Sequence, residues 1–205
     1  GAGAPPGGGF AAPGPRHTEH IIETFWALPK ERADARHYPS IDWVTSFSGH
    51  VGTAALWWAK EVDRHWEARR GQALALLARD AELSRIVNLV GPEALSHAQR
   101  WELEGASLIK EAVLQQSALD PVDTFCSPKK QFALLDLALT IYDRGAALIE
   151  LGIPVQELQH LPMLAKARRC KAIYNSEQVD GILAFHRECE QTLEQELPVR
   201  LQGEA

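Results

Sequence analysis

The sequence lacks any apolar run long enough to cross a bilayer, and its first residues show no basic region followed by an apolar segment. A membrane-spanning helix needs roughly 20 predominantly apolar residues, and a secretory signal needs that basic-then-apolar order. With 45% hydrophobic and 23% charged residues, the 205-residue chain has the composition of an ordinary globular protein. A chain of this length can bury one good core, or a core and a smaller lobe. We expect a cytoplasmic protein, at most peripheral to a membrane.

Positive charge is also in short supply, because 21 Lys and Arg face 27 Asp and Glu, for a net charge of −6. Nucleic acid is therefore not an expected partner, since its binding needs clustered cations that displace counterions. The three cysteines, Cys126, Cys170 and Cys189, form no Cys-x-x-Cys pair. An odd number without a signal sequence favours reduced, buried structural thiols.

Three catalytic motifs are missing as well. The chain has no Gly-x-x-x-x-Gly-Lys-Ser/Thr phosphate loop, no Gly-x-Ser-x-Gly elbow and no His-Glu-x-x-His pair. We therefore predict no catalytic residues. His17 and His20, like His186 and Cys189, would share a helix face, but two ligands fall short of a zinc site and no metal is predicted.

Periodicity predicts mostly helices after a Gly- and Pro-rich loop over residues 1–15. The apolar residues at 21–28 allow a buried strand or a helical turn. A helix is expected from Gly52, interrupted at Gly71, and a second one that stops at Gly91-Pro92, where glycine can terminate a helix and proline cannot continue it.

Two capping signals and one apolar stripe predict the remaining helices. Ser96 is a plausible N-cap for a helix towards Gln116, and Ser127-Pro128 prepares another through Leu148. From Val179 to Leu197, apolar residues recur at helical spacing with Glu and Gln opposite. The basic residues 166–171 are expected at a solvated helix end, with a partner contact as the lesser alternative. The sum is a bundle of unequal antiparallel helices.

Five blocks, in one order along the chain, resemble a known family: residues 1–10, 25–28, 36–48, 89–95 and 114–126. Leu114 to Cys126 reads Leu-Gln-Gln-Ser-Ala-Leu-Asp-Pro-Val-Asp-Thr-Phe-Cys. It is similar to the Leu-Gln-Gln-Asn-Ala-Phe-Asp-x-Val-Asp-Thr-Tyr-Cys signature of the catalytic A subunit of archaeal and vacuolar-type rotary ATPases. Likewise Arg36 to Ser48 is similar to that family's Arg-His-Phe-Pro-Ala-Ile-Asn-Trp-Leu-Thr-Ser-Tyr-Ser.

The resemblance implies the C-terminal region of that subunit. The expected fold is mainly α: a helical C-terminal bundle over residues 49–205, preceded by a short fragment of the α/β P-loop nucleotide-binding domain over residues 1–48. It also implies an adenine pocket, in which the family's two aromatic positions fall on Tyr38 and Leu119, and Phe125 lines the same pocket. Leu119 offers aliphatic packing only, which should weaken the pocket by about 1 kcal/mol. From the residues alone, plain core packing would be the expected role of these side chains.

By the same resemblance, the intact subunit binds ATP or ADP with Mg²⁺ against a B subunit, and its helical domain pushes the central stalk, coupling hydrolysis or synthesis to H⁺ or Na⁺ transport. The isolated chain should hold no cofactor and be inactive. In the first block, Ala4, Gly9 and Ala11-Ala12 replace the family's Ser, Asp and Ser-Glu. An alternative is therefore a free-standing helical interaction module without nucleotide turnover. In either case we expect self-association, or local disorder of residues 1–30, because Phe25 and Trp26 should be exposed.

Overall fold

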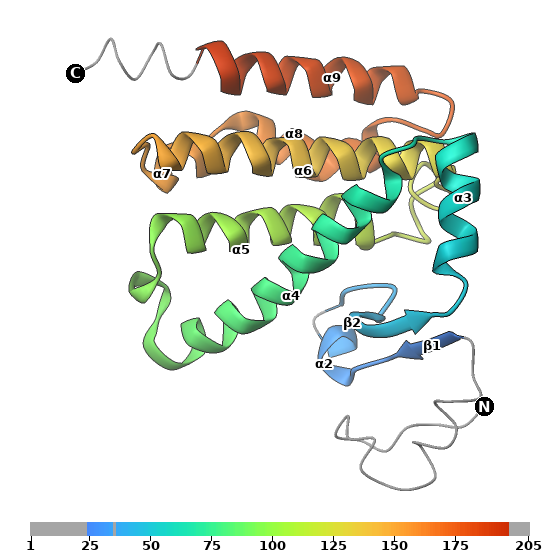
Figure 1. Cartoon of the computed structure of the whole chain (residues 1–205), viewed down its shortest axis with the longest axis horizontal. Helices are drawn as coiled ribbons and strands as arrows, with labels where there is room; N and C mark the ends of the chain where they lie inside the picture. The colour runs from blue at the N-terminus through green and yellow to red at the C-terminus, as the bar shows by residue number, and fades with distance from the viewer. Residues whose placement is uncertain (1–23, 35, 197–205) are drawn as a thin grey trace, which may run out of the picture.

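The protein is mainly helical, as predicted. We describe it from a computed structural model over residues 24–34 and 36–196. The expected loop at residues 1–15 and the His17–His20 pair lie outside the described residues. A small hairpin lies beside a bundle of helices, and the described chain ends on the far side of that bundle (Figure 1). The predicted helical C-terminal bundle is confirmed, whereas the domain boundary at residue 48 stays a prediction.

The hairpin pairs β1 (Thr24–Ala27) antiparallel with β2 (Asp42–Ser48), with the short helix α2 (Lys30–Asp34) between them. Phe25 lies opposite Phe47 in the register, and their rings stack with centroids 6.0 Å apart. The strand predicted around Phe25 is therefore confirmed. It is not a buried strand, however, because Trp26 is 66% exposed.

Helix α3 (Val51–Glu61) and helix α4 (Trp66–Val90) meet at a break over residues 62–65. The break predicted at Gly71 was wrong, since Gly71 lies inside α4. At the true break the amides of Val62 and Asp63 both donate to the Trp58 carbonyl. The Asp63 carboxylate accepts from the His65 amide at 2.7 Å, and such a local side-chain bond competes with helix continuation.

The end predicted at Gly91 and the caps predicted at Ser96 and Ser127 are confirmed. Helix α4 ends before Gly91, which has a φ of 85°, and a 3₁₀ turn η1 (Pro92–Ala94) follows. Ser96 caps α5 (His97–Ile109) with Gln99 in a reciprocal capping box. Ser127 caps α6 (Pro128–Glu150) by accepting from the Lys130 amide.

Between α5 and the α6 cap, the π-helical turn η2 (Lys110–Leu114) leads into a loop. After α6 come the short helix α7 (Val155–Gln159), then α8 (Pro162–Ile173) and α9 (Val179–Gln191), which continues into the π turn η3 (Thr192–Glu196). None of the helices among residues 24–34 and 36–196 is both long and apolar enough to cross a membrane.

The core lies around α6, which packs against α5 on one side and α9 on the other (Figure 1). The Trp101 indole is buried and donates its Nε1–H to the Tyr142 carbonyl at 2.9 Å. Along α9 and η3, the buried stripe is Ile182, Phe185, Cys189 and Leu193. Burial raises the pKa of the Cys170 thiol to about 11 and that of Cys189 to about 12. These two thiols are buried as predicted, whereas Cys126 is only half-buried.

The solvated helix end predicted for residues 166–171 is only partly right, since Arg169 is exposed and the Lys166 side chain is 41% exposed, whereas Arg168 and Lys171 are largely covered. These residues lie within α8, where Arg168 forms an ion pair with Glu104 of α5 and lies 3.2 Å from Glu111 of η2. Although burial disfavours its charge, the hydrogen bonds and charges of those two carboxylates raise the pKa of Arg168. Within the run, Arg168 and Lys171 therefore face acidic residues of neighbouring elements, whereas Arg169 faces solvent.

Candidate functional site

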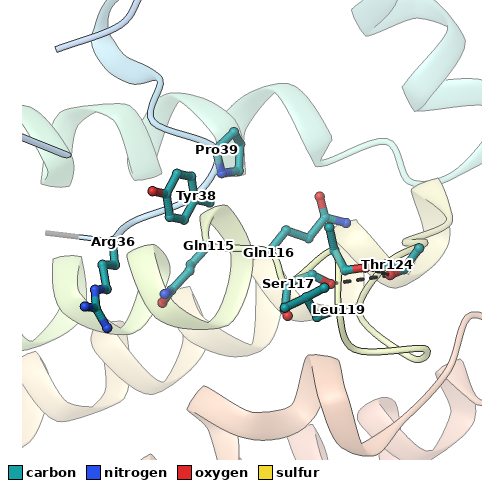
Figure 2. A pocket seen from close by; sticks show the side chains of 9 residues that line it. Arg36, Tyr38, Pro39, Gln115, Gln116, Ser117, Leu119 and Thr124 are labelled. Carbon is teal, nitrogen blue, oxygen red and sulfur yellow. Dashed lines mark hydrogen bonds between the residues drawn. The ribbon is translucent and has the colours of Figure 1, made fainter. Parts of the chain in front are cut away.

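Two segments far apart in the sequence meet at a cavity of about 560 Å³. One segment leads from α2 to β2, and the other is the loop between η2 and α6. In Figure 2, the first contributes Arg36, Tyr38 and Pro39, and the second contributes Gln115, Gln116, Ser117, Leu119 and Thr124. Ala118 completes the lining.

One backbone hydrogen bond joins the two segments. The amide of Gln116 donates to the carbonyl of Tyr38 at 2.8 Å. On the Tyr38 side, Arg36 has a φ of 55°, and the amides of Arg36 and His37 donate back to the carbonyls of Ala33 and Arg32. This left-handed residue turns the chain out of α2 and towards the cavity.

The second segment, residues 115–124, is held by its own acidic side chains. Asp120 Oδ1 accepts from the amides of Val122 and Asp123 at 2.8 and 3.2 Å. The buried Asp123 carboxylate accepts from the Ser117 amide at 2.7 Å. Thr124 Oγ1 donates to the Ala118 carbonyl at 3.0 Å. The loop is therefore ordered by hydrogen bonds between its side chains and its own backbone amides and carbonyls, as a buried or half-buried loop requires.

Two lysines of the helical bundle donate hydrogen bonds to the backbone of this loop. Lys130, which is fully buried, donates to the carbonyls of Val122 and Lys171 at 3.4 and 2.7 Å. Lys171 of α8 donates to the Gln115 carbonyl, and its Nζ lies 3.8 Å from Asp123 Oδ2. Burial lowers the pKa of Lys171, although the Asp123 charge acts in the opposite direction. The cavity loop is thus anchored to the helical bundle through cations.

Of the three residues predicted from the sequence, the structure brings Tyr38 and Leu119 together on the cavity wall. Tyr38 is 54% exposed and Leu119 is 96% exposed, so both present apolar surface at the cavity. Phe125 is not part of the lining. It follows the loop where the Phe125 carbonyl accepts from Ser176 Oγ at 3.3 Å, close to the start of α6.

The sequence reasoning missed the polar lining, namely Arg36, Gln115, Gln116 and Thr124. These residues lie inside or beside the blocks that pointed to Tyr38 and Leu119, so proximity in the motif was the available signal. His37, the neighbour of Tyr38, packs instead against Trp43, with ring centroids 5.2 Å apart. Burial lowers the pKa of His37, so its neutral ring serves packing.

A metal centre does not fit the described part of the chain. Over residues 24–34 and 36–196, no three His, Cys, Asp or Glu side chains converge on one point. The His186–Cys189 pair divides between two roles, since Cys189 is buried and His186 Nδ1 lies 3.6 Å from Asp136 Oδ2. The cavity instead offers an aromatic face, an aliphatic face, neutral amide groups and the Arg36 guanidinium. The first three suit a flat, uncharged ring.

Comparison with known proteins identifies the family. The family described as the C-terminal domain of V and A type ATP synthase matches residues 55–158. The V-type ATP synthase alpha chain of Nitrosococcus oceani is 60% identical over 188 residues, 92% of this chain and 32% of that protein. The A subunit of the A-type ATP synthase of Ignicoccus hospitalis is 43% identical over 156 residues, 76% of this chain and 26% of that protein.

A solved structure shares the fold. The ATP synthase subunit NeqB from Nanoarcheaum equitans matches with a TM-score of 0.53 and 22% identity, covering 67% of this chain and 32% of that one. At that identity the match supports the fold alone. The chain spans between 17% and 33% of the length of the curated relatives that it matches.

Proposed function

The chain belongs to the family formed by the A subunits of V- and A-type ATP synthases, and from that premise we propose that it is the lever and part of the adenine pocket of a rotary ATPase. Its matched residues correspond to the C-terminal part of the catalytic subunit. In the proposal, the residues around the cavity hold the base of ATP or ADP, and the bundle transmits the resulting movement.

The observation that carries the proposal is the joining of the Tyr38 and Leu119 segments around one cavity. An adenine ring inserted between them would cover both exposed side chains. Full burial of a side chain such as leucine contributes about 1.5–3 kcal/mol, and a stacked aromatic pair adds about 0.5–1.5 kcal/mol. The neutral amide of Gln115 on the same wall can bond a ring nitrogen or the exocyclic amine.

The intact subunit would bind this nucleotide with Mg²⁺, but the described residues do not fit the metal, because no three suitable ligands converge. The phosphate and metal contacts of the proposal therefore come from outside the described residues. The proposed partners are the central stalk and the B subunit, the transported ion is H⁺ or Na⁺, and the proposed location is the cytoplasmic head of the enzyme, peripheral to the membrane.

The test uses adenosine, which needs no phosphate contacts. Saturation transfer from the chain to adenosine should be strongest at the base protons and should be lost in Tyr38→Ala. Tyr38→Phe keeps the aromatic face and should keep the transfer. The matched control is Trp57→Ala, an exposed aromatic outside the cavity lining. Equal transfer in the unmodified chain and in Tyr38→Ala would reject the adenine pocket.

A second candidate is a helical interaction module without nucleotide turnover. The observation that favours it is Leu119, which stands at the cavity where the family carries an aromatic residue. The reading frame upstream of Gly1 separates the two candidates. A phosphate loop encoded there supports the rotary enzyme, and a frame without one supports the interaction module.

A further inference from the structure

Lys171 is the point at which helix α8 contacts the cavity loop. Its side chain is 14% exposed, its Nζ donates to the Gln115 carbonyl, and the Asp123 carboxylate lies 3.8 Å away. The backbone of Lys171 takes part as well, because its carbonyl accepts from Lys130 Nζ at 2.7 Å. One residue of α8 therefore contacts both ends of the segment that spans residues 115–123.

Asp123 is the acidic partner of Lys171 in this contact. Its carboxylate is 5% exposed and accepts from the Ser117 amide at 2.7 Å. A buried carboxylate needs a compensating charge or hydrogen bonds. Lys130 is nearby, but its Nζ donates to two carbonyls, so Lys171 is the cation paired with Asp123. The positive charge of Lys171 on α8 and the negative charge of Asp123 in the loop therefore compensate each other.

The dipeptide Gln115-Gln116 connects this anchor to the aromatic wall of the cavity. The Gln115 carbonyl accepts from Lys171 on the bundle side. The very next amide, that of Gln116, donates to the Tyr38 carbonyl at 2.8 Å. Because the Gln115 carbonyl and the Gln116 N–H belong to one planar peptide group, a shift of α8 would be passed through this single group to the residue that carries the ring.

We propose that Lys171 is a positioning residue that couples the occupancy of the cavity to helix α8. The inference rests on the proposed function for the nature of the ligand, but the ordering of the loop by Lys171 can be measured without one. Coupling of this kind is reciprocal. If Lys171 orders the cavity for its ligand, the ligand must in turn reduce the motion of α8.

The experiment measures amide hydrogen exchange of the whole chain, with and without adenosine as the probe. Lys171→Met should accelerate exchange over residues 115–124 by about tenfold, while the α5–α6 core stays unchanged. It should weaken adenosine binding by about fivefold or more. In the unmodified chain adenosine should slow exchange around residue 171, and this effect should vanish in the variant.

Two further variants separate positioning from a general structural role. Lys171→Arg keeps a donor and a positive charge and should restore both the loop exchange and the binding. Lys166→Met is the matched control on the same helix, where Lys166 Nζ lies 3.4 Å from Glu188 and over the Phe185 ring, away from the cavity. It should behave as the unmodified chain does.

Should Lys171→Met fail to fold, Asp123→Asn provides the same test, because it keeps an acceptor for Ser117 and removes the charge that faces Lys171. Unchanged loop exchange in Lys171→Met, or in Asp123→Asn where the first does not fold, overturns the proposal. Equal acceleration in Lys166→Met also overturns it. If the unmodified chain does not bind adenosine, the proposed function fails. The proposal then stands or falls on whether Lys171→Met, unlike Lys166→Met, accelerates loop exchange.

Discussion

At Gly145 the backbone of α6 lies against the indole of Trp101. A Cβ atom at this position would lie 2.1 Å from Trp101 Cζ2, and the indole is held by its bond to the Tyr142 carbonyl. Gly145→Ala should therefore lower the free energy of unfolding by about 1–3 kcal/mol through overpacking, measured by urea denaturation. Gly71→Ala is the control, because nothing lies within 4 Å of a Cβ there. Gly71→Ala should raise the free energy of unfolding by about 0.5–1 kcal/mol, because position 71 is an exposed position inside α4. Equal effects would contradict this account.

Leu119 lines the cavity where the related family carries an aromatic residue. Leu119→Phe places a second aromatic ring on the wall of the cavity that Tyr38 also lines and should tighten adenosine binding by roughly five- to tenfold, the equivalent of about 1 kcal/mol of aromatic pairing. Isothermal titration or ligand-observed NMR measures the change. Leu183→Phe, an exposed leucine on α9, is the control and should bind as the unmodified chain does. Unaltered affinity in Leu119→Phe would remove Leu119 from the pocket.

Tyr38, Leu119 and Lys171 show which residues of the candidate adenine site can be predicted from the sequence. Tyr38 and Leu119 were predicted as adenine contacts from family motifs, and the structure places both on one cavity. Lys171 was missed, although it anchors the loop, because its partners Gln115 and Asp123 lie about fifty residues away in the sequence. Pairing at that separation is a property of tertiary packing, and no local pattern reports it.

Among the elements, α4 and α6 are joined by a polar cluster around Arg69. Its Nε lies 2.7 Å from Asp136 Oδ1, and its Nη1 lies 2.9 Å from Asp143 Oδ2. Arg69→Met would leave two half-buried carboxylates without this cation, so we expect a loss of about 1–3 kcal/mol in the free energy of unfolding. Arg79→Met, which removes an exposed pairing on the same helix, should have little effect. The prediction fails if both variants unfold at the same denaturant concentration.

Element boundaries divide into those set locally and those set by packing. The starts at Ser96 and Ser127 and the end at Gly91 were predictable, because a cap is a bond within one turn of the chain. The break at residues 62–65 was not, since it combines the Asp63–His65 bond with a Trp58–Trp66 stack at 5.0 Å. Gly71 misled the prediction because an isolated glycine is tolerated in a helix at a cost of about 1 kcal/mol.

For the whole molecule, the two buried thiols predict a loss of stability in alkali. The folded-state pKa values of Cys170 and Cys189, about 11 and about 12, lie above the ordinary value of 9.0. Their contribution is fully present below about pH 9 and is lost as the pH rises towards 11 and 12, because only the unfolded chain ionises in that window. Each thiol adds a slope of about 1.4 kcal/mol per pH unit there. Urea midpoints between pH 8 and pH 11 measure this, and a Cys170→Ala, Cys189→Ala variant should show a flatter decline. An identical decline in both proteins would assign it to other groups.

The hairpin and α3 expose several large apolar side chains: Trp26, Leu28, Val44, Phe47, Leu56 and Trp57. Exposed apolar surface of this kind promotes association, so we predict that the chain self-associates through these elements and that its sedimentation coefficient rises with concentration. Leu56→Lys, at a leucine that is 76% exposed, should shift the population towards monomer without lowering the melting temperature, because the side chain contributes little to the core. Leu183→Lys on α9 adds the same charge on a different element and should leave association unchanged. A concentration-independent monomer for the unmodified chain would contradict the prediction, and equal dissociation by both substitutions would assign the effect to net charge. Association that only Leu56→Lys reduces would identify the hairpin and α3 as the face that a longer chain or another protein of the complex covers.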